Sequence, residues 1–162
     1  LNHGIILNIW DMEKHKIKQS GFTLIEILVV IGIIAILAAV VIVALNPARQ
    51  FAQARNTQRW SNVNTILNAV SQRMADKRGV WTLDATCLDA IPASASFIGT
   101  IAANIDLQPC IVPTYVSTMV MDPSLGTAGD TRYTIFQAAG ANGRLTVAAP
   151  DAELAEVISV TR

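Results

Sequence analysis

One stretch decides the fold of this chain, residues 14–45: KHKIKQSGFTLIEILVVIGIIAILAAVVIVAL. A basic segment ends at Gly21, and the 24 residues from Phe22 to Leu45 contain a single ionisable side chain, Glu26. A helix over those residues is roughly 36 Å long at 1.5 Å per residue, which exceeds the roughly 30 Å of hydrocarbon in a bilayer. The sequence therefore predicts a membrane-spanning helix over residues 22–45.

The carboxylate of Glu26 lies inside the predicted span. An ionised side chain at that depth costs roughly 3 kcal/mol or more, so such groups usually have a partner. A cut between Gly21 and Phe22 would create an α-amino group one helical turn from Glu26, on the same subunit or on a neighbour. Either pairing would neutralise both charges in an apolar setting.

The hexapeptide GFTLIE at residues 21–26, preceded by lysines and followed by an unbroken apolar run, resembles the processing site of type IV prepilins and of the related pseudopilins of type II secretion. The resemblance implies that a prepilin peptidase cuts after Gly21 and methylates the new N-terminus at Phe22. It also implies that Glu26 guides docking of the subunit into a helical filament. The implied partners are this peptidase, an inner-membrane assembly platform, further copies of the chain and related minor pilins.

Two simpler explanations of the segment are an ordinary signal peptide and an uncleaved single-span anchor. A secretory signal has an apolar core of only 7–15 residues, followed by a small-residue cleavage site. The run in this chain is longer, and its polar break lies at its start. These features favour the prepilin interpretation, in which residues 1–21 form the leader peptide.

We expect translation to begin at Met12, with residues 1–11 an upstream extension. The resulting leader carries Lys14, Lys16 and Lys18 beside the span. Positive charge at that position favours a cytoplasmic leader and an exported C-terminal part. The expected locations are the inner membrane for the precursor and an extracellular pilus filament for the product, or a periplasmic pseudopilus in the alternative interpretation.

The composition disfavours an enzyme. Both histidines, His3 and His15, precede the expected cut, so the processed chain would have no histidine for a triad, a general base or a metal site. We find no clear nucleophile and no cofactor fingerprint, and we expect no cofactor and no metal. Residues 22–162 hold nine basic and ten acidic side chains, a sum of −1, so a nucleic-acid partner is not expected.

Residues 46–79 are predicted to be an amphipathic continuation of the helix, with a kink or local melt at Asn46-Pro47. Gly79 is the expected terminator. The whole helix, residues 22–78, would have 57 residues and a length of roughly 86 Å. Its apolar face is expected to be Val63, Ile66, Leu67, Val70 and Met74.

Three arginines lie near the start of this continuation, beside aromatic residues. Arg49, Arg55 and Arg59 accompany Phe51 and Trp60, a pattern that can bind single-stranded nucleic acid. We favour contacts with lipid headgroups before assembly and with acidic groups of neighbouring subunits afterwards.

Residues 80–113 are expected to be a connecting loop. The only two cysteines, Cys87 and Cys110, lie in it, and in an exported protein a disulfide is expected in preference to two buried free thiols. Asp122, Asp130 and Asp151 supply oxygen donors in later loops, and related major pseudopilins bind calcium in their C-terminal region. These three residues lack a regular ligand spacing, so we assign no calcium site.

Residues 114–162 are expected to form an antiparallel β-sheet. Residues 132–137 and 144–147 predict a hairpin around a turn at residues 140–143, residues 157–160 a further strand, and residues 115–120 one more. The expected fold is α+β and type IV pilin-like: a long N-terminal membrane-spanning helix packs through its C-terminal half on a small antiparallel sheet.

The function expected from these observations is structural. The processed chain, residues 22–162, would polymerise through its apolar helix as a type IV pilus subunit. A pseudopilin of a type II secretion system is the alternative, and an uncleaved membrane-anchored binding domain is a third hypothesis.

Overall fold

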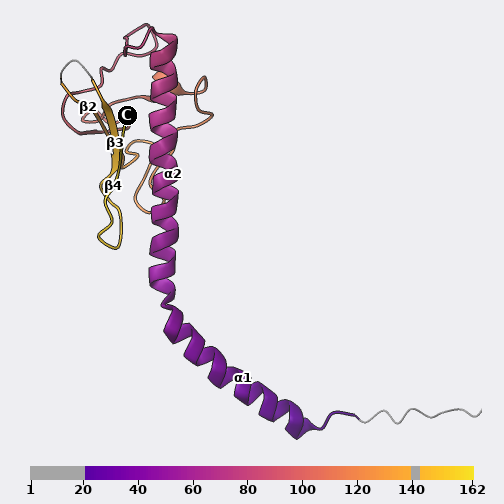
Figure 1. Cartoon of the computed structure of the whole chain (residues 1–162). Helices are drawn as coiled ribbons and strands as arrows, with labels where there is room; N and C mark the ends of the chain where they lie inside the picture. The colour runs from indigo at the N-terminus through magenta and orange to yellow at the C-terminus, as the bar shows by residue number, and fades with distance from the viewer. Residues whose placement is uncertain (1–20, 140–142) are drawn as a thin grey trace, which may run out of the picture. The chain divides into compact units, whose positions relative to one another are not determined.

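The computed structural model describes residues 21–139 and 143–162 of the chain. It divides into two compact units that meet along the chain at Ala44 and Leu45, and each is described by itself. The first contains α1 (Leu24–Leu45) except its last residue, and the second contains α2 (Pro47–Asp76), a short helix α3 (Gln108–Ile111) and a four-stranded sheet. Figure 1 labels α1, α2 and three strands of the sheet.

Helix α1 is apolar on all sides. It has 22 residues, which corresponds to roughly 33 Å, and none of its side chains is buried in the protein. Within the described residues it is the one helix long and apolar enough to cross a membrane. A helix that is hydrophobic all round must be buried in lipid or in other protein, so α1 lacks its natural surroundings in the isolated chain.

The expected interruption at Asn46-Pro47 is present. Asn46 has a left-handed backbone (φ 43°), and its side-chain oxygen accepts a hydrogen bond from the Arg49 amide at 3.3 Å. Pro47 opens α2, where its fixed φ suits a helix and its missing N–H costs nothing. The predicted interruption divides the expected 57-residue helix into α1 and α2.

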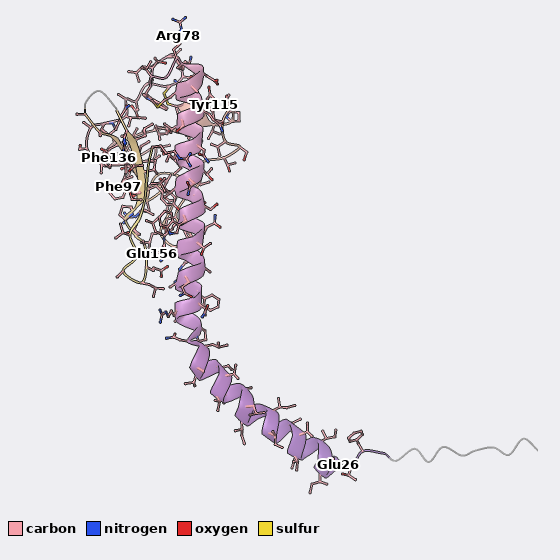
Figure 2. The ribbon with its side chains drawn as sticks, viewed as in Figure 1. Glu26, Arg78, Phe97, Tyr115, Phe136 and Glu156 are labelled. Carbon is pink, nitrogen blue, oxygen red and sulfur yellow. A yellow bond between two sulfur atoms is a disulfide. The ribbon has the colours of Figure 1, made fainter. Side chains whose placement is uncertain are left out.

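The C-terminal end of α2 differs slightly from the prediction. Arg78 and Gly79 are both left-handed, with φ 65° and 86°, and Arg78 rather than Gly79 is the first residue after the C-cap Lys77. The Gly79 amide donates to the Met74 carbonyl at 2.7 Å, the long-range bond of a Schellman cap. Figure 2 shows Arg78 at this end of the helix.

The sheet is antiparallel, with the order β1-β2-β3-β4. Its strands are β1 (Ser96–Phe97), β2 (Thr134–Gln137), β3 (Leu145–Ala149) and β4 (Ile158–Thr161). Strands β2 and β3 form the predicted hairpin, paired from Thr134↔Ala148 to Gln137↔Leu145, and residues 140–142 of its turn lie outside the described residues. The α+β expectation is confirmed, with the sheet along one side of α2 (Figure 1).

The strand predicted at residues 115–120 is wrong. The amides of Tyr115 and Val116 both donate to the Ile111 carbonyl, so a local turn after α3 uses the groups that a β-ladder would need. The Tyr115 hydroxyl donates to the Asp76 carboxylate at 2.9 Å. The fourth strand is β1, which comes from the segment expected to be a loop. Its two residues are too few to show a period of two in the sequence.

The apolar stripe of α2 forms the core with the sheet, as predicted. Four of its five members are fully buried, and Met74 packs partly buried at the end of the stripe. The sheet contributes every second side chain, and the register pairs Val147 with both Ile135 and Val160. The core therefore contains Val63, Ile66, Leu67, Val70, Ile135, Leu145, Val147, Ala149 and Ile158.

Candidate processing and assembly site

The Gly21–Phe22 bond lies just ahead of α1, in exposed, non-helical chain. A Cβ added to Gly21 would meet no other atom within 4 Å, and its φ is not in the left-handed range. The described structure therefore gives no steric or conformational reason for glycine at this position. A requirement for glycine would have to come from another protein that recognises this bond.

Thr23 and Glu26 form a capping box at the start of α1. The Glu26 carboxylate accepts hydrogen bonds from the Thr23 amide and the Thr23 hydroxyl, both at 2.8 Å. The Glu26 amide donates to the Thr23 hydroxyl oxygen at 3.3 Å. This reciprocal arrangement satisfies backbone donors that a helix start leaves unpaired. Figure 2 shows Glu26 at this end of α1.

Thr23 is a partner of Glu26 that the sequence reasoning missed. The signal was present, because a threonine followed three residues later by glutamate before an apolar run is the pattern of a capping box. A carboxylate offers about four acceptor positions, so the two bonds from Thr23 leave room for another donor. The amino group predicted to form at Phe22 would be such a donor.

Arg55 and Arg59 do not have the partners predicted for them. Both bind Glu153 in the connection between β3 and β4: Arg55 donates twice at 2.6 Å, and Arg59 once at 2.9 Å. Arg59 also holds Asp122 with a 2.6 Å bond from Nε and a 3.2 Å bond from Nη2. Burial of Arg59 contradicts the contacts with headgroups and neighbouring subunits expected for it. For Arg55, whose side chain is 37% exposed, and for Arg49, which is exposed, those contacts stay predictions.

Burial and charge shift the protonation equilibria of this cluster. The Arg59 side chain is 1% exposed and that of Asp122 is fully buried. Burial raises the pKa of Asp122, but hydrogen bonds from Arg59 and from the Ser124 and Leu125 amides outweigh it, so the pKa lies below its usual value. Hydrogen bonds from Arg55 and then Arg59 lower the pKa of Glu153 to about 2. All these groups remain ionised at neutral pH.

The three loop aspartates considered for calcium are each bonded to an arginine. Asp122 pairs with Arg59, whereas Arg132 donates to Asp151 at 2.7 and 3.2 Å and to Asp130 at 3.5 Å. Across residues 21–139 and 143–162, no group of three or more acidic, histidine or cysteine side chains is arranged to hold a metal ion.

Cys87 and Cys110 form a disulfide in the structure, and both are buried. The bond joins the segment after α2 to α3. Asp84 reinforces this region: its carboxylate accepts from the Thr86 hydroxyl at 2.8 Å and from Arg73 at 3.0 Å. The segment between α2 and β1 is therefore fixed to the core.

Comparison with known proteins identifies one family model. The model of the prokaryotic N-terminal methylation motif matches residues 16–42, which include the Gly21–Phe22 bond, the capping box and most of α1. No solved structure matches the chain.

Proposed function

We propose that this chain, whose methylation motif supports its recognition as a type IV pilin or pseudopilin precursor, is a structural subunit of a type IV pilus. Such precursors are structural proteins rather than enzymes, and the motif with the apolar helix α1 supports a membrane-anchored precursor. The motif also implies processing by prepilin peptidase and assembly into a polymer. The finer proposal is cleavage after Gly21, methylation at Phe22 and polymerisation through α1.

The observation that carries this proposal is the unburied apolar helix directly behind the Gly21–Phe22 bond. Large apolar side chains are exposed along the whole of α1. Transfer of α1 from the bilayer to a filament core made of the same helix from other subunits keeps those side chains out of water throughout. The proposed partners in that transfer are the inner-membrane assembly platform, further copies of the chain and related minor pilins.

In the proposed filament Glu26 selects the stagger between subunits. Its carboxylate is the one ionisable side chain of α1 and already accepts two hydrogen bonds from Thr23. An α-amino group at Phe22 of a neighbouring subunit would add a charge-assisted bond, which an apolar environment strengthens. A subunit docked out of register would leave the carboxylate and the amino group buried without a partner. The energetic cost of those two unpaired charges disfavours the wrong stagger.

A pseudopilin of a type II secretion system is the alternative. The pilus is favoured because the carboxylates of Asp122, Asp130 and Asp151, which a calcium site resembling that of major pseudopilins would use, are engaged by Arg59 and Arg132. The two alternatives differ in location, an extracellular filament or a short periplasmic fibre.

The test is N-terminal analysis and intact mass of the protein in filaments sheared from the cell surface. We expect a chain beginning at N-methylated Phe22 in that fraction. The same species found only in the envelope would favour the pseudopilin, and an unprocessed chain in the membrane would refute both. Gly21→Val is the variant to compare with the native chain, because the described structure has room for the larger side chain. We expect it to fold normally but to remain uncleaved, since only recognition of the Gly21–Phe22 bond by the peptidase should be impaired.

A second experiment separates processing from assembly. Glu26→Gln keeps the size of the side chain and its ability to accept from Thr23, but removes the charge. We expect a processed, methylated chain that stays in the membrane and fails to enter filaments. Normal filament yield from Glu26→Gln would refute the register role of the charge.

A further inference from the structure

We propose that the end of the C-terminal unit next to the span is a lipid-docking surface that rests on anionic headgroups before assembly. This docking surface consists of Arg49 and Phe51 on α2 and Leu154 in the connection between β3 and β4. The inference rests on the part of the proposed function in which α1 anchors the precursor in a membrane, and it does not depend on polymerisation.

Chain connectivity brings Arg49 to the membrane surface. It follows Leu45, the last residue of α1, by four positions, so its Cα lies within about 14 Å of the end of the span at any angle between the helices. The headgroup layer of a bilayer is roughly 5–8 Å thick on each side. An arginine side chain at that distance reaches the lipid phosphates.

Leu154 lies beside the first turn of α2 although it is about 105 positions away in the sequence. Asn46, Ala48, Arg49 and Leu154 line one open hollow of about 450 Å³. Figure 1 shows the connection between β3 and β4 extending beyond the strands along α2 toward its Pro47 end. The hollow therefore combines a cation with an apolar side chain.

A network of hydrogen bonds fixes this connection on α2. The Asn56 side chain donates to the Glu153 carbonyl at 2.7 Å and accepts from the Glu153 amide at 2.9 Å, as a paired strand would. Leu154 and Ala155 follow with φ 59° and 55°, a left-handed conformation that costs energy for residues with a side chain. Leu154 is nevertheless 50% exposed. The fixed backbone of the connection therefore holds this apolar side chain at the surface of the unit.

The charges of this region favour an anionic partner. Glu153 is engaged by Arg55 and Arg59, and Glu156 accepts hydrogen bonds from Asn56 and from the Trp60 indole. Arg49 makes no ion pair with any residue of the described ranges, 21–139 and 143–162. An unpaired arginine among exposed apolar side chains matches the composition of surfaces that lie in the membrane interface.

Phe51 extends the docking surface around the helix. It is 65% exposed and lies in the second turn of α2. Two positions beyond Arg49 correspond to about 200° around the helix, so Phe51 lies on nearly the opposite side of α2 from Arg49. Aromatic rings are stabilised at the boundary between headgroups and acyl chains. A half-exposed leucine is stabilised at the same boundary, because its apolar surface leaves water. A bilayer surface that meets the Pro47 end of α2 is broad enough to contact both sides of the helix, so it accounts for the arginine, the aromatic ring and the leucine together.

The test uses the full-length chain in vesicles of phosphatidylethanolamine and phosphatidylglycerol. A nitroxide is attached at Leu154→Cys or, as the matched control, at Val80→Cys, and labelling without reductant keeps Cys87 and Cys110 paired. Val80 is 55% exposed and follows the opposite end of α2, two positions after Arg78 in the sequence. Figure 2 labels Arg78 at that end. Collision with a water-soluble nickel chelate and with oxygen reports the depth of each label.

We expect the label at position 154 to collide less with the nickel chelate and more with oxygen than the label at position 80. Arg49→Gln should weaken docking about fivefold on anionic vesicles, since one arginine near such a surface contributes about 1 kcal/mol. The effect should vanish on phosphatidylcholine vesicles, and Arg78→Gln, at the far end of α2, should have no effect.

Three outcomes would overturn the inference. Equal accessibility at positions 154 and 80 would mean that the surface faces water. Protection at position 154 that disappears when the protein is diluted in lipid would identify a second copy of the chain as the occupant. Unchanged docking of Arg49→Gln would exclude the headgroup contact. Flotation of the chain with the vesicles tests anchoring by α1 separately, so a failure of anchoring is distinguishable from a failure of docking.

Discussion

Replacement of Arg59 by methionine removes the central cation of the buried cluster while it keeps an unbranched apolar side chain where the arginine methylenes lie. In the variant Asp122 would remain fully buried, with hydrogen bonds only from the Ser124 and Leu125 amides at 2.8 and 3.0 Å. Ser124 and Glu153 would also lose bonds from the guanidinium. The native structure has no other cation positioned on Asp122 within the residues described.

The expected loss of stability is large. Removal of one partner from a buried ion pair costs about 3–5 kcal/mol, because the other charge stays buried without compensation. For a unit of this size, 1 kcal/mol lowers the melting temperature by roughly 3–5 °C. Arg59→Met should therefore melt about 10–20 °C below the native chain at neutral pH.

The loss should depend on pH in a definite direction. The pKa of Asp122 lies below its ordinary value in the native fold, so its ionised form stabilises the fold above the unfolded pKa of about 3.9. That contribution disappears as the pH falls through the native pKa. In Arg59→Met the burial of Asp122 is no longer offset by the guanidinium, so the pKa of Asp122 rises. Protonation in acid then removes the unpaired buried charge. The difference between the two proteins should shrink in acid.

The assay is thermal unfolding of the full-length chain in detergent, followed by near-ultraviolet circular dichroism at pH 7 and near pH 3. Arg49→Met is the control, because that arginine is exposed on the same helix and its loss should cost under about 0.5 kcal/mol. A loss below about 1 kcal/mol for Arg59→Met, or an equal deficit at both pH values, would refute the account of the cluster.

Three further predictions concern the same unit. Paired replacement Cys87→Ala and Cys110→Ala should cost about 3 kcal/mol by denaturant titration, since the bridge spans 23 positions; no loss would mean that packing alone holds the segment. Arg78→Gly should stabilise by about 1 kcal/mol, because glycine tolerates φ 65°, whereas Gly79→Ala at φ 86° should destabilise; a reversed order would contradict the cap assignment. Glu153→Gln should lower stability above the unfolded pKa of about 4.3, and the difference from the native chain should disappear as the pH falls to about 2. A difference that does not change with pH would show that the ion pairs of Glu153 with Arg55 and Arg59 do not stabilise the fold.

The candidate site was largely readable from local sequence. The predictions for Gly21, Phe22 and Glu26 depend on consecutive residues and on an apolar run whose length can be counted. The contact between Thr23 and Glu26 is also local, so a capping-box pattern predicted it in principle. Processing, methylation and the register role of Glu26 stay predictions, since they concern partners outside the chain.

The arginine cluster was not readable in this way. Arg59 and Asp122 are 63 positions apart, and Arg55 and Glu153 are 98 positions apart. The composition of residues 49–60 is equally compatible with a surface that binds anions. Only tertiary packing pairs Arg59 with Asp122 in the loop before β2, and pairs Arg55 with Glu153 in the β3–β4 connection.

The sequence by itself determined the span, the break at Asn46-Pro47, the apolar stripe of α2 and the hairpin of β2 and β3, because each depends on composition or periodicity within a short window. Only the tertiary structure decided the identity of the fourth strand and the partners of Arg55 and Arg59. Two-residue β1 exists because β2 offers it a paired edge, and a buried arginine is stable only where the fold supplies a carboxylate. Both depend on residues distant in the chain, whose meeting is a property of the packed structure.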